Sequence, residues 1–151
     1  DGERKLTKQG EFEAQLMADW LTKMNVDVAH LWVSPFIRAQ QTCAIISKNL
    51  AVKPEILDFI TPAGDAKHVH DFIDAFVLEQ LDNSKINDSD KDPQGVFIVS
   101  HMPLVSYLVA ELTSYQAAPI FATAAIAEIS YDIKLMKGEL VRLISPLDLC
   151  E

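Results

Sequence analysis

Apolar residues recur along this chain with two different spacings, which predict alternating helices and strands. Four segments carry apolar residues three or four positions apart, the spacing of a helix with one buried face: residues 6–24, 34–50, 66–81 and 103–112. Short runs of apolar and β-branched residues predict strands at residues 28–33, 55–59, 96–100, 125–132 and 139–144. This alternation predicts an α/β fold.

The run Val-Phe-Ile-Val-Ser at residues 96–100 has no alternating polar positions. Such a strand is expected to be buried on both faces, as central strands of a parallel sheet are. We therefore expect a three-layer sandwich with a mainly parallel central sheet, formed by a single domain over residues 1–151. The last two strands are expected to form a hairpin around Lys137-Gly138, and residues 82–95 a polar, acidic loop.

Polar residues and prolines mark the points where the predicted helices begin. Thr7, Ser34 and Asp65 belong to the residue types that cap helix N-termini by accepting a hydrogen bond from a backbone N–H. Pro35 and Pro103 suit a first helical turn, where the missing N–H would have no partner in any case. Two of these helix starts directly follow predicted strands.

Composition and charge narrow the class of protein. Apolar residues make up 49% of the chain, which is enough for a buried core, and no apolar run reaches the length of a membrane span. No signal peptide is recognisable. With 13 basic and 22 acidic residues the net charge is −9, which disfavours a nucleic-acid partner. The two cysteines, Cys43 and Cys150, have neither metal-binding nor disulfide-framework spacing, so a reducing cytoplasm is expected.

Two residues with phosphate-binding chemistry follow predicted parallel strands. Arg38 lies one turn into the helix after strand 28–33, and His101 directly follows strand 96–100. Because the carboxyl ends of parallel strands share one edge of a sheet, both side chains are expected at the same rim, beside helix N-termini that favour anions. A guanidinium offers a planar fork of donors to two oxygens, and an imidazolium would add two more donors.

Each candidate also has a purely structural interpretation. Arg38 could form a surface ion pair, and His101 could be a hydrogen-bonded core histidine. Asp65 could cap the helix of residues 66–81, with proton donation as the alternative. The remaining histidines and one cysteine are interpreted as structural: His30, His68, His70 and Cys43. On a helix, the spacing of His68 and His70 directs the two rings apart, so no metal site is expected there.

Several segments of the chain resemble the histidine phosphatase (phosphoglycerate-mutase-like) superfamily. The stretches VSPFIRAQQT (33–42) and VFIVSHMPLV (96–105) are similar to its two downstream motifs, in particular to those of the small SixA-type phosphohistidine phosphatases. Five further stretches resemble the same subgroup: LTKQG and QLMADWL within 6–21, TPAGD (61–65), VSYLVAEL (105–112) and FATAAIAEISYD (121–132). The resemblance covers nearly the whole chain and implies a phosphoglycerate-mutase-like fold.

The resemblance implies a phosphatase reaction that needs no metal and no cofactor. In this family a phosphoryl group passes to a histidine nucleophile, and water then hydrolyses the phosphohistidine. Two arginines and a second histidine hold the oxygens on which transition-state charge develops. Arg38 matches the second of these arginines and His101 the second histidine, so both are implied to be catalytic and phosphate-binding.

One departure from the family pattern concerns the nucleophile. The family carries it in an Arg-His-Gly motif on the first strand, upstream of the LT-x-x-G segment that begins here at Leu6, and no Arg-His-Gly occurs in the chain. Since the first residue is Asp1 and not methionine, we expect the native protein to extend upstream. The extension would supply this strand, the nucleophile and the first arginine. The alternative is a truncated, inactive form, in which neighbouring strands would hold unpaired backbone groups at a cost of about 1–3 kcal/mol each.

A second departure concerns the general acid. Larger family members place a glutamate in the loop after the second strand, whereas residues 61–65 here contain none. An imidazole leaving group needs protonation less than an alkoxide does, so the absence of this glutamate favours hydrolysis of an N–P bond. Asp65 remains the candidate for weak proton donation.

The leading hypothesis is therefore a cytoplasmic phosphohistidine phosphatase. It would act on a phosphorelay (His-containing phosphotransfer) protein through a phosphohistidine enzyme intermediate. A small-molecule phosphomonoesterase is the second hypothesis. The third is a non-catalytic domain that binds phosphate or a phosphoprotein, if the nucleophile is truly absent.

Overall fold

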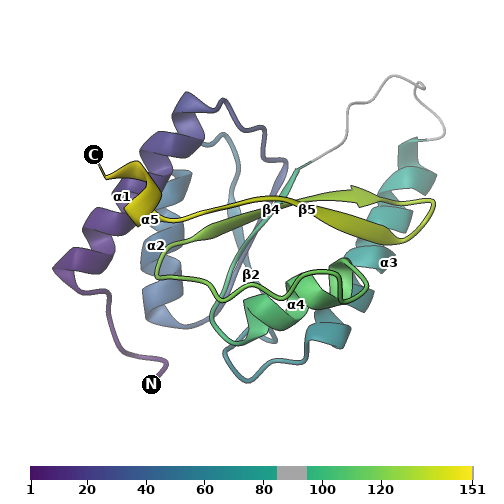
Figure 1. Cartoon of the computed structure of the whole chain (residues 1–151), viewed down its shortest axis with the longest axis horizontal. Coiled ribbons are helices and arrows are strands. Elements are labelled where there is room, and N and C mark those ends of the chain that lie inside the picture. Colours follow the sequence, from purple (N-terminus) through teal and green to yellow (C-terminus); the bar gives the residue numbers. More distant parts are fainter. Residues whose placement is uncertain (85–94, 151) are drawn as a thin grey trace.

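A computed structural model of the chain describes residues 1–84 and 95–150 (Figure 1). The helices are α1 (Lys8–Lys23), α2 (Ile37–Ser47), α3 (Ala66–Ser84), α4 (Leu104–Leu112) and the short α5 (Pro146–Leu149). The strands are β1 (His30–Val33), β2 (Pro54–Ile56), β3 (Val96–Val99), β4 (Ile126–Asp132) and β5 (Lys137–Ile144). None of the helices within the described ranges is long and apolar enough to cross a bilayer.

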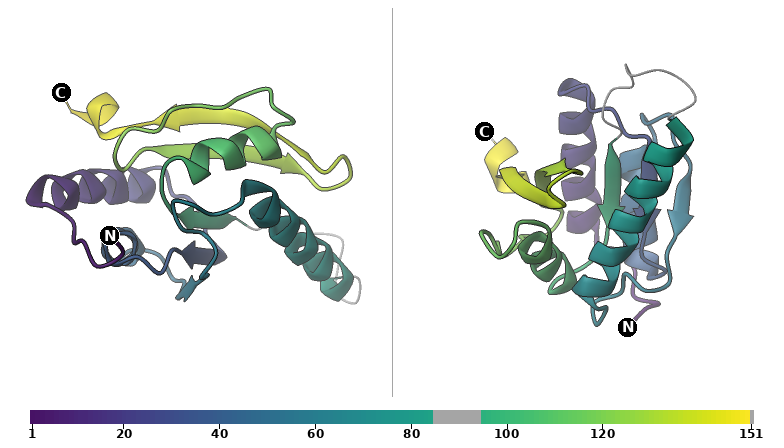
Figure 2. Two further views of the ribbon diagram at one scale, coloured as in Figure 1. Left: turned by 90° about the horizontal axis from the view of Figure 1, so that it is seen from below. Right: turned by 90° about the vertical axis from the view of Figure 1, so that its right-hand side faces the viewer.

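The strands form a parallel sheet and an antiparallel hairpin. The parallel sheet has the order β2-β1-β3, and β1 pairs with β3 in the register His30 to Val96 through Val33 to Val99. The hairpin pairs β4 with β5 and has an irregular register between Glu128 and Ile129. Figures 1 and 2 show α1 and α2 on one side of the parallel strands, with α3 and α4 on the other. The predicted α/β layering with a parallel sheet is confirmed.

Alternating side chains of β1 explain why helices cover both faces of the sheet. Trp32 packs into the cluster formed with α3 and α4, where its ring makes edge contacts with Phe72 and Phe76 at 5.1 Å. Leu31 and Val33 point the opposite way, into the cluster of buried residues on α2. Because consecutive strand residues face opposite sides, one four-residue strand contributes to two cores.

The ends of several elements differ from the sequence-based predictions. The predicted cap at Ser34 is wrong, because α2 begins three residues later behind Phe36, and no side chain caps it. The predicted hairpin turn at Lys137-Gly138 is also wrong, since Gly138 lies inside β5 opposite Tyr131. The turn occupies residues 133–136 instead.

The predicted double-sided burial of residues 96–100 holds only in part. In β3, Val99 is buried, whereas Val96, Phe97 and Ile98 are half-buried. Within the described residues β3 pairs along one edge only, with β1. The predicted loop at 82–95 begins later than expected, because α3 continues to Ser84, and residues 85–94 lie outside the described residues.

Candidate active site

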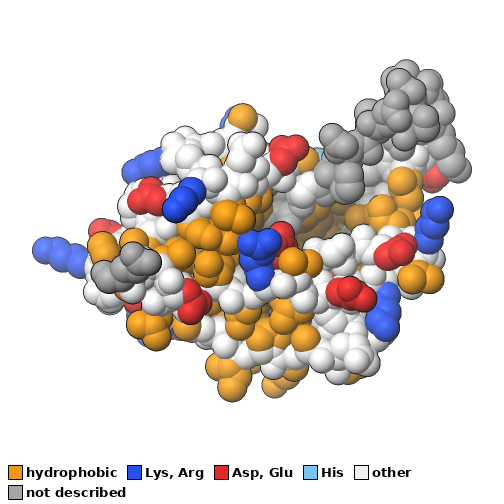
Figure 3. All heavy atoms as spheres, turned by 45° about the horizontal axis from the view of Figure 1, so that its top comes forward, with side chains coloured by type: hydrophobic (Ala, Val, Ile, Leu, Met, Phe, Trp, Pro, Cys, Tyr) orange, Lys and Arg blue, Asp and Glu red, His pale blue; other side chains and the backbone are white. Residues whose placement is uncertain are grey.

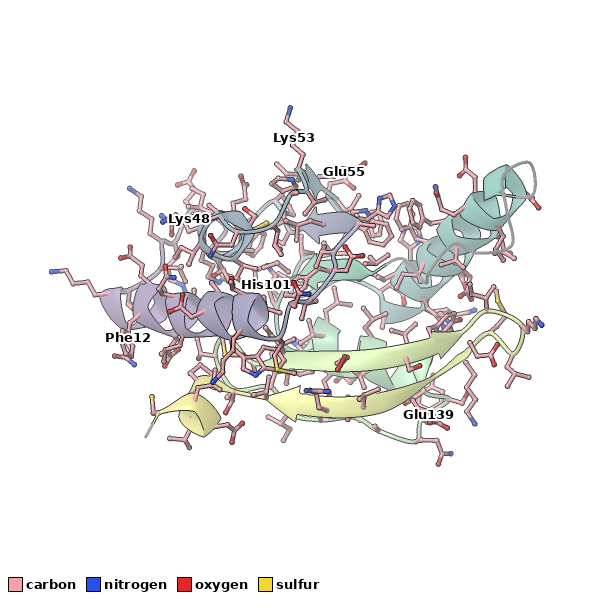
Figure 4. The ribbon with its side chains drawn as sticks, turned by 90° about the horizontal axis from the view of Figure 1, so that it is seen from above. Phe12, Lys48, Lys53, Glu55, His101 and Glu139 are labelled. Carbon is pink, nitrogen blue, oxygen red and sulfur yellow. The ribbon has the colours of Figure 1, made fainter. Side chains whose placement is uncertain are left out.

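The carboxyl ends of β1 and β3 bring two polar side chains into direct contact. Ser34 follows β1, and its N–H donates to the carbonyl oxygen of Val99 at 3.0 Å, which extends the ladder between the strands by one bond. His101 follows β3 by two residues, and its Nε2 lies 2.7 Å from the Ser34 Oγ. In Figure 4 His101 lies near the centre of the molecule, and its ring is partly buried.

Phe36 connects His101 with Arg38 at this rim. The Arg38 guanidinium lies over the Phe36 ring, 5.0 Å from its centroid, and the same ring lies 5.0 Å from the centroid of the His101 imidazole. A cation placed over an aromatic face is held there by the ring quadrupole. The structure therefore brings Arg38 and His101 together at one edge of the sheet, as the parallel topology predicts.

The His101 ring is neutral near pH 7 in this environment. Burial, followed by the positive charge of Arg38, lowers the pKa of His101 from its ordinary value to about 4. This environment favours the neutral ring over an imidazolium with two donors. The sequence shows that a histidine follows the strand, but not that Ser34 occupies one ring nitrogen while protein atoms displace water from around the ring.

Asp1 and Arg4 belong to the same charged group, although no motif in the sequence marks them. The Arg38 Nη1 donates to the Asp1 carbonyl oxygen at 3.0 Å, and its Nη2 lies 3.5 Å from the Asp1 carboxylate. Arg4 approaches the other oxygen of this carboxylate at 3.7 Å. The pKa of Arg38 is lowered by burial and, to a smaller extent, by the charge of Arg4. One carboxylate thus lies between two guanidinium groups, an arrangement suited to an anion.

The loop at residues 61–65 is fixed to the same rim, but Asp65 is engaged elsewhere. The Ser100 hydroxyl donates to the Ile60 carbonyl oxygen at 2.8 Å, which holds the start of this loop against the end of β3. The Asp65 carboxylate accepts from the N–H of Lys67 at 2.9 Å, so the predicted cap of α3 is confirmed. In the described part of the chain no hydrogen bond joins Asp65 to His101, and proton donation by Asp65 stays a prediction.

The other histidines pack against separate neighbours. His30 makes an edge contact with Phe76 at 4.6 Å, and His68 makes one with Phe59 at 4.7 Å. His70 instead lies 3.3 Å from a carboxylate oxygen of Glu111. The rings of His68 and His70 therefore do not converge. The predicted burial of Cys43 is also confirmed, and this burial raises the pKa of its thiol to about 11.

The distribution of charged side chains over the described part of the surface shows no extended basic face in the view of Figure 3. On the face shown in Figure 3, lysine and arginine side chains are scattered singly among acidic and apolar groups. A phosphate backbone would need these cations clustered along one face. The local group of cations at the rim consists of Arg38 and Arg4.

The chain is similar in sequence to proteins of one enzyme family. The sequence profile of the histidine phosphatase superfamily (branch 1) matches residues 2–61. The chain is 37% identical over 134 residues to the phosphohistidine phosphatase SixA of Escherichia coli strain K12. This aligned region covers 87% of this chain and 76% of that protein. It is 36% identical over 141 residues to the SixA homolog of Haemophilus influenzae strain KW20, with 87% and 79% covered.

A solved structure gives the same answer for the fold. The protein histidine phosphatase SixA complexed with tungstate matches with a TM-score of 0.86 and 35% sequence identity, covering 99% of this chain and 89% of that one. Identity above 30% over most of both chains, together with this likeness of fold, extends the resemblance well beyond the two short motifs. The chain therefore belongs to the histidine phosphatase superfamily, as a SixA-type member with a phosphoglycerate-mutase-like fold.

Proposed function

We propose that this protein is a phosphohistidine phosphatase whose Arg38 and His101 hold the phosphoryl group during its transfer. The observation that carries the proposal is the assembly at one sheet rim of a guanidinium and an imidazole from two different strand–helix junctions, joined through Phe36. Its substrate would be a phosphorylated protein, specifically a His-containing phosphotransfer protein of a phosphorelay. The unpaired cysteines, Cys43 and Cys150, fit a cytoplasmic location.

The charges at the rim fit a phosphoryl group better than a neutral ligand. A guanidinium can donate to two phosphoryl oxygens at once, and such charge-assisted bonds are about twice as strong as neutral ones. No side chain caps α2 or α4, so the positive ends of both helices can face an anion. Tungstate, which is bound in the solved SixA structure, is itself an oxyanion.

The chemistry of the loop at residues 61–65 favours an N–P bond. This loop carries no glutamate, and its one carboxylate, Asp65, already accepts a hydrogen bond from the first turn of α3. An imidazole leaves from phosphorus with little help because its conjugate acid has a pKa near neutrality, whereas an alkoxide requires a general acid. The names of the two SixA relatives point to the same substrate class.

The nucleophile of the proposed reaction is a histidine other than His101. Residues 1–151 contain no Arg-His-Gly motif, and the described residues around Arg38 include only one histidine, His101. The proposal assigns to Arg38 and His101 the binding of the phosphoryl oxygens, and to another histidine the formation of the phosphoenzyme.

The test compares substrates on the intact protein. Release of phosphate would be measured from a phosphorylated His-containing phosphotransfer protein, from a phosphoserine peptide and from a sugar phosphate. We expect the phosphohistidine protein to react fastest and the enzyme to carry a transient, acid-labile phosphate that mass spectrometry can locate. Faster hydrolysis of either ester would favour the phosphomonoesterase hypothesis. Phosphoprotein binding without turnover or phosphoenzyme would favour the non-catalytic one.

A further inference from the structure

We infer that Ser34 is a positioning residue that fixes the tautomer of His101, so that the ring offers its Nδ1–H, and not its Nε2–H, to the phosphoryl group. The inference rests on the proposed function for its catalytic meaning. The tautomer itself can be measured without any substrate. The sequence predicts that Ser34 caps a helix, a role that it does not have in the structure.

The position of Ser34 is set by the sheet. Its side chain is fully buried, with 0% of its surface exposed, and its N–H continues the β1–β3 ladder through the carbonyl oxygen of Val99. The hydroxyl therefore cannot turn toward water. A buried hydroxyl in such a place is expected to use its hydrogen-bonding capacity on fixed protein partners.

The partners of the hydroxyl determine the direction of its bond to His101. The backbone N–H of Phe36 donates to the Ser34 Oγ at 3.2 Å, which uses one acceptor position of that oxygen. The single proton of the hydroxyl then needs an acceptor, and the His101 Nε2 lies 2.7 Å away. Among the described residues this hydroxyl makes hydrogen bonds with the Phe36 N–H and the His101 ring, and with no other group. Donation from Ser34 requires an Nε2 without a proton, so the neutral ring must carry its proton on Nδ1.

The opposite arrangement would leave a buried donor without a partner. If the Nε2 of His101 carried the proton, it would donate to the Ser34 Oγ, and the serine hydroxyl proton would face no acceptor. An unsatisfied buried donor retains its full cost of desolvation. The imidazolium form meets the same obstacle, and burial of the ring, followed by the positive charge of Arg38, opposes it further by lowering the pKa of His101.

The assigned tautomer has a consequence for the reaction. A neutral ring with its proton on Nδ1 gives a phosphoryl oxygen one donor of fixed direction, while Arg38 provides the positive charge. The packing of Phe36 against the ring limits its rotation, and the N–H of the same residue anchors the Ser34 oxygen. Ser34 thus acts through His101 and needs no contact with the substrate.

The direct test is the protonation state of His101 in ¹⁵N-labelled protein. Long-range ¹H–¹⁵N correlation spectra distinguish the two neutral tautomers and the imidazolium, and the His101→Gln variant identifies the signals of this ring. At pH 7 we expect the form protonated on Nδ1 in the wild type. We expect an increased share of the Nε2-protonated form in Ser34→Ala, and the wild-type form in Ser34→Thr. The Ser106→Ala variant, which alters another buried serine, should leave the spectrum unchanged.

Several outcomes would overturn the inference. It is refuted by an Nε2-protonated or doubly protonated ring in the wild type, a measurement that requires no variant to fold. It is equally refuted if folded Ser34→Ala keeps the wild-type tautomer.

Activity measurements separate this inference from the proposed function. We expect Ser34→Ala to lower kcat about tenfold, the loss of one net hydrogen bond in the transition state. KM should change less, and the acid limb of the pH–rate profile should move to higher pH, because the ring becomes easier to protonate. The Ser34→Thr variant should recover most of this rate and Ser106→Ala should keep it. If His101 has the expected tautomer but the protein has no phosphatase activity, only the proposed function is refuted. If the enzyme is active but His101 has the other tautomer, only the role of Ser34 is refuted.

Discussion

Replacing Arg38 by alanine tests whether the guanidinium at the rim is part of the catalytic machinery. The side chain is held over the Phe36 ring and is mostly shielded from water, with 19% of its surface exposed. Its substitution removes two charge-assisted donors to the phosphoryl oxygens. Hydrogen bonds to charged groups contribute about 1.5–3 kcal/mol each. The two bonds together contribute about 3–6 kcal/mol. If half of that interaction develops only in the transition state, the barrier rises by about 1.5–3 kcal/mol, which corresponds to a loss of about 10- to 10²-fold in kcat.

The assay is single-turnover dephosphorylation of a phosphohistidine protein by the intact enzyme. Arg38→Lys separates charge from geometry, because an ammonium keeps the charge but lacks the planar fork, so an intermediate rate is expected. Arg142→Ala serves as the matched control, since Arg142 is an exposed arginine whose ion pair with Glu128 at 2.8 Å lies in the hairpin. This control should retain wild-type activity.

Two results would refute the reasoning. A rate for Arg38→Ala within threefold of the wild type would make Arg38 a surface residue whose ion pair with Asp1 is its whole role. An equal loss of activity in Arg142→Ala would show that general acidification of the surface, and not the rim, determines the rate. Thermal unfolding of each variant distinguishes a damaged fold from a damaged site.

Three further predictions concern pH, packing and anion competition. Because the pKa of His101 is about 4 when folded and near 6.5 when unfolded, unfolding takes up a proton between these values and stability falls as the pH decreases through them. With allowance for screening by solvent, the free energy of unfolding falls by about 1–2 kcal/mol over this range. The free energy measured by urea unfolding should depend less on pH in His101→Gln. Gly64→Ala should destabilise the protein by about 1–3 kcal/mol, measured by the same unfolding, because the added Cβ would lie 2.5 Å from the carbonyl oxygen of Phe59. Asp1→Asn should strengthen tungstate binding about two- to fivefold in calorimetry, since it removes a carboxylate worth at most about 1 kcal/mol from Arg38; unchanged affinity would exclude competition.

The elements of the fold could be predicted because each depends on a local pattern that packing then reinforces. The helix α3 illustrates this, since its apolar residues Val69 and Ile73, four positions apart, are both buried in the structure. The sequence misplaces the hairpin turn because glycine is typical of turns. Gly138 lies in β5 for another reason, since a Cβ there would come within 2.6 Å of the Ile129 side chain and 3.2 Å of the Leu112 carbonyl oxygen. That close approach is a tertiary fact, and the sequence does not record it.

The candidate site likewise combines features that the sequence predicts with features that it does not. The meeting of Arg38 and His101 follows from topology alone, because two parallel strands place their carboxyl ends at one rim. The protonation of His101 does not, because it depends on burial and on the hydroxyl of Ser34, which lies 67 positions away in the chain. A polar residue within two positions of a strand's carboxyl end is nevertheless a readable signal, and it applies to Ser34 as much as to His101. The roles of Asp1 and Arg4 have no such signal.

The protein has a net charge of −9 and yet concentrates its anion-binding chemistry at one point. A guanidinium about 4 Å from a phosphoryl oxygen contributes about 4 kcal/mol per unit charge at an effective dielectric constant of 20. Exposed carboxylates more than a Debye length away, about 8–10 Å in physiological salt, oppose this only weakly. The balance at the site is therefore decided by the nearest groups, which are Arg38, Arg4 and the Asp1 carboxylate between them. Because His101 is neutral, it adds direction to this site without adding charge, and the acidic surface opposes a phosphoryl group at the proposed site only weakly.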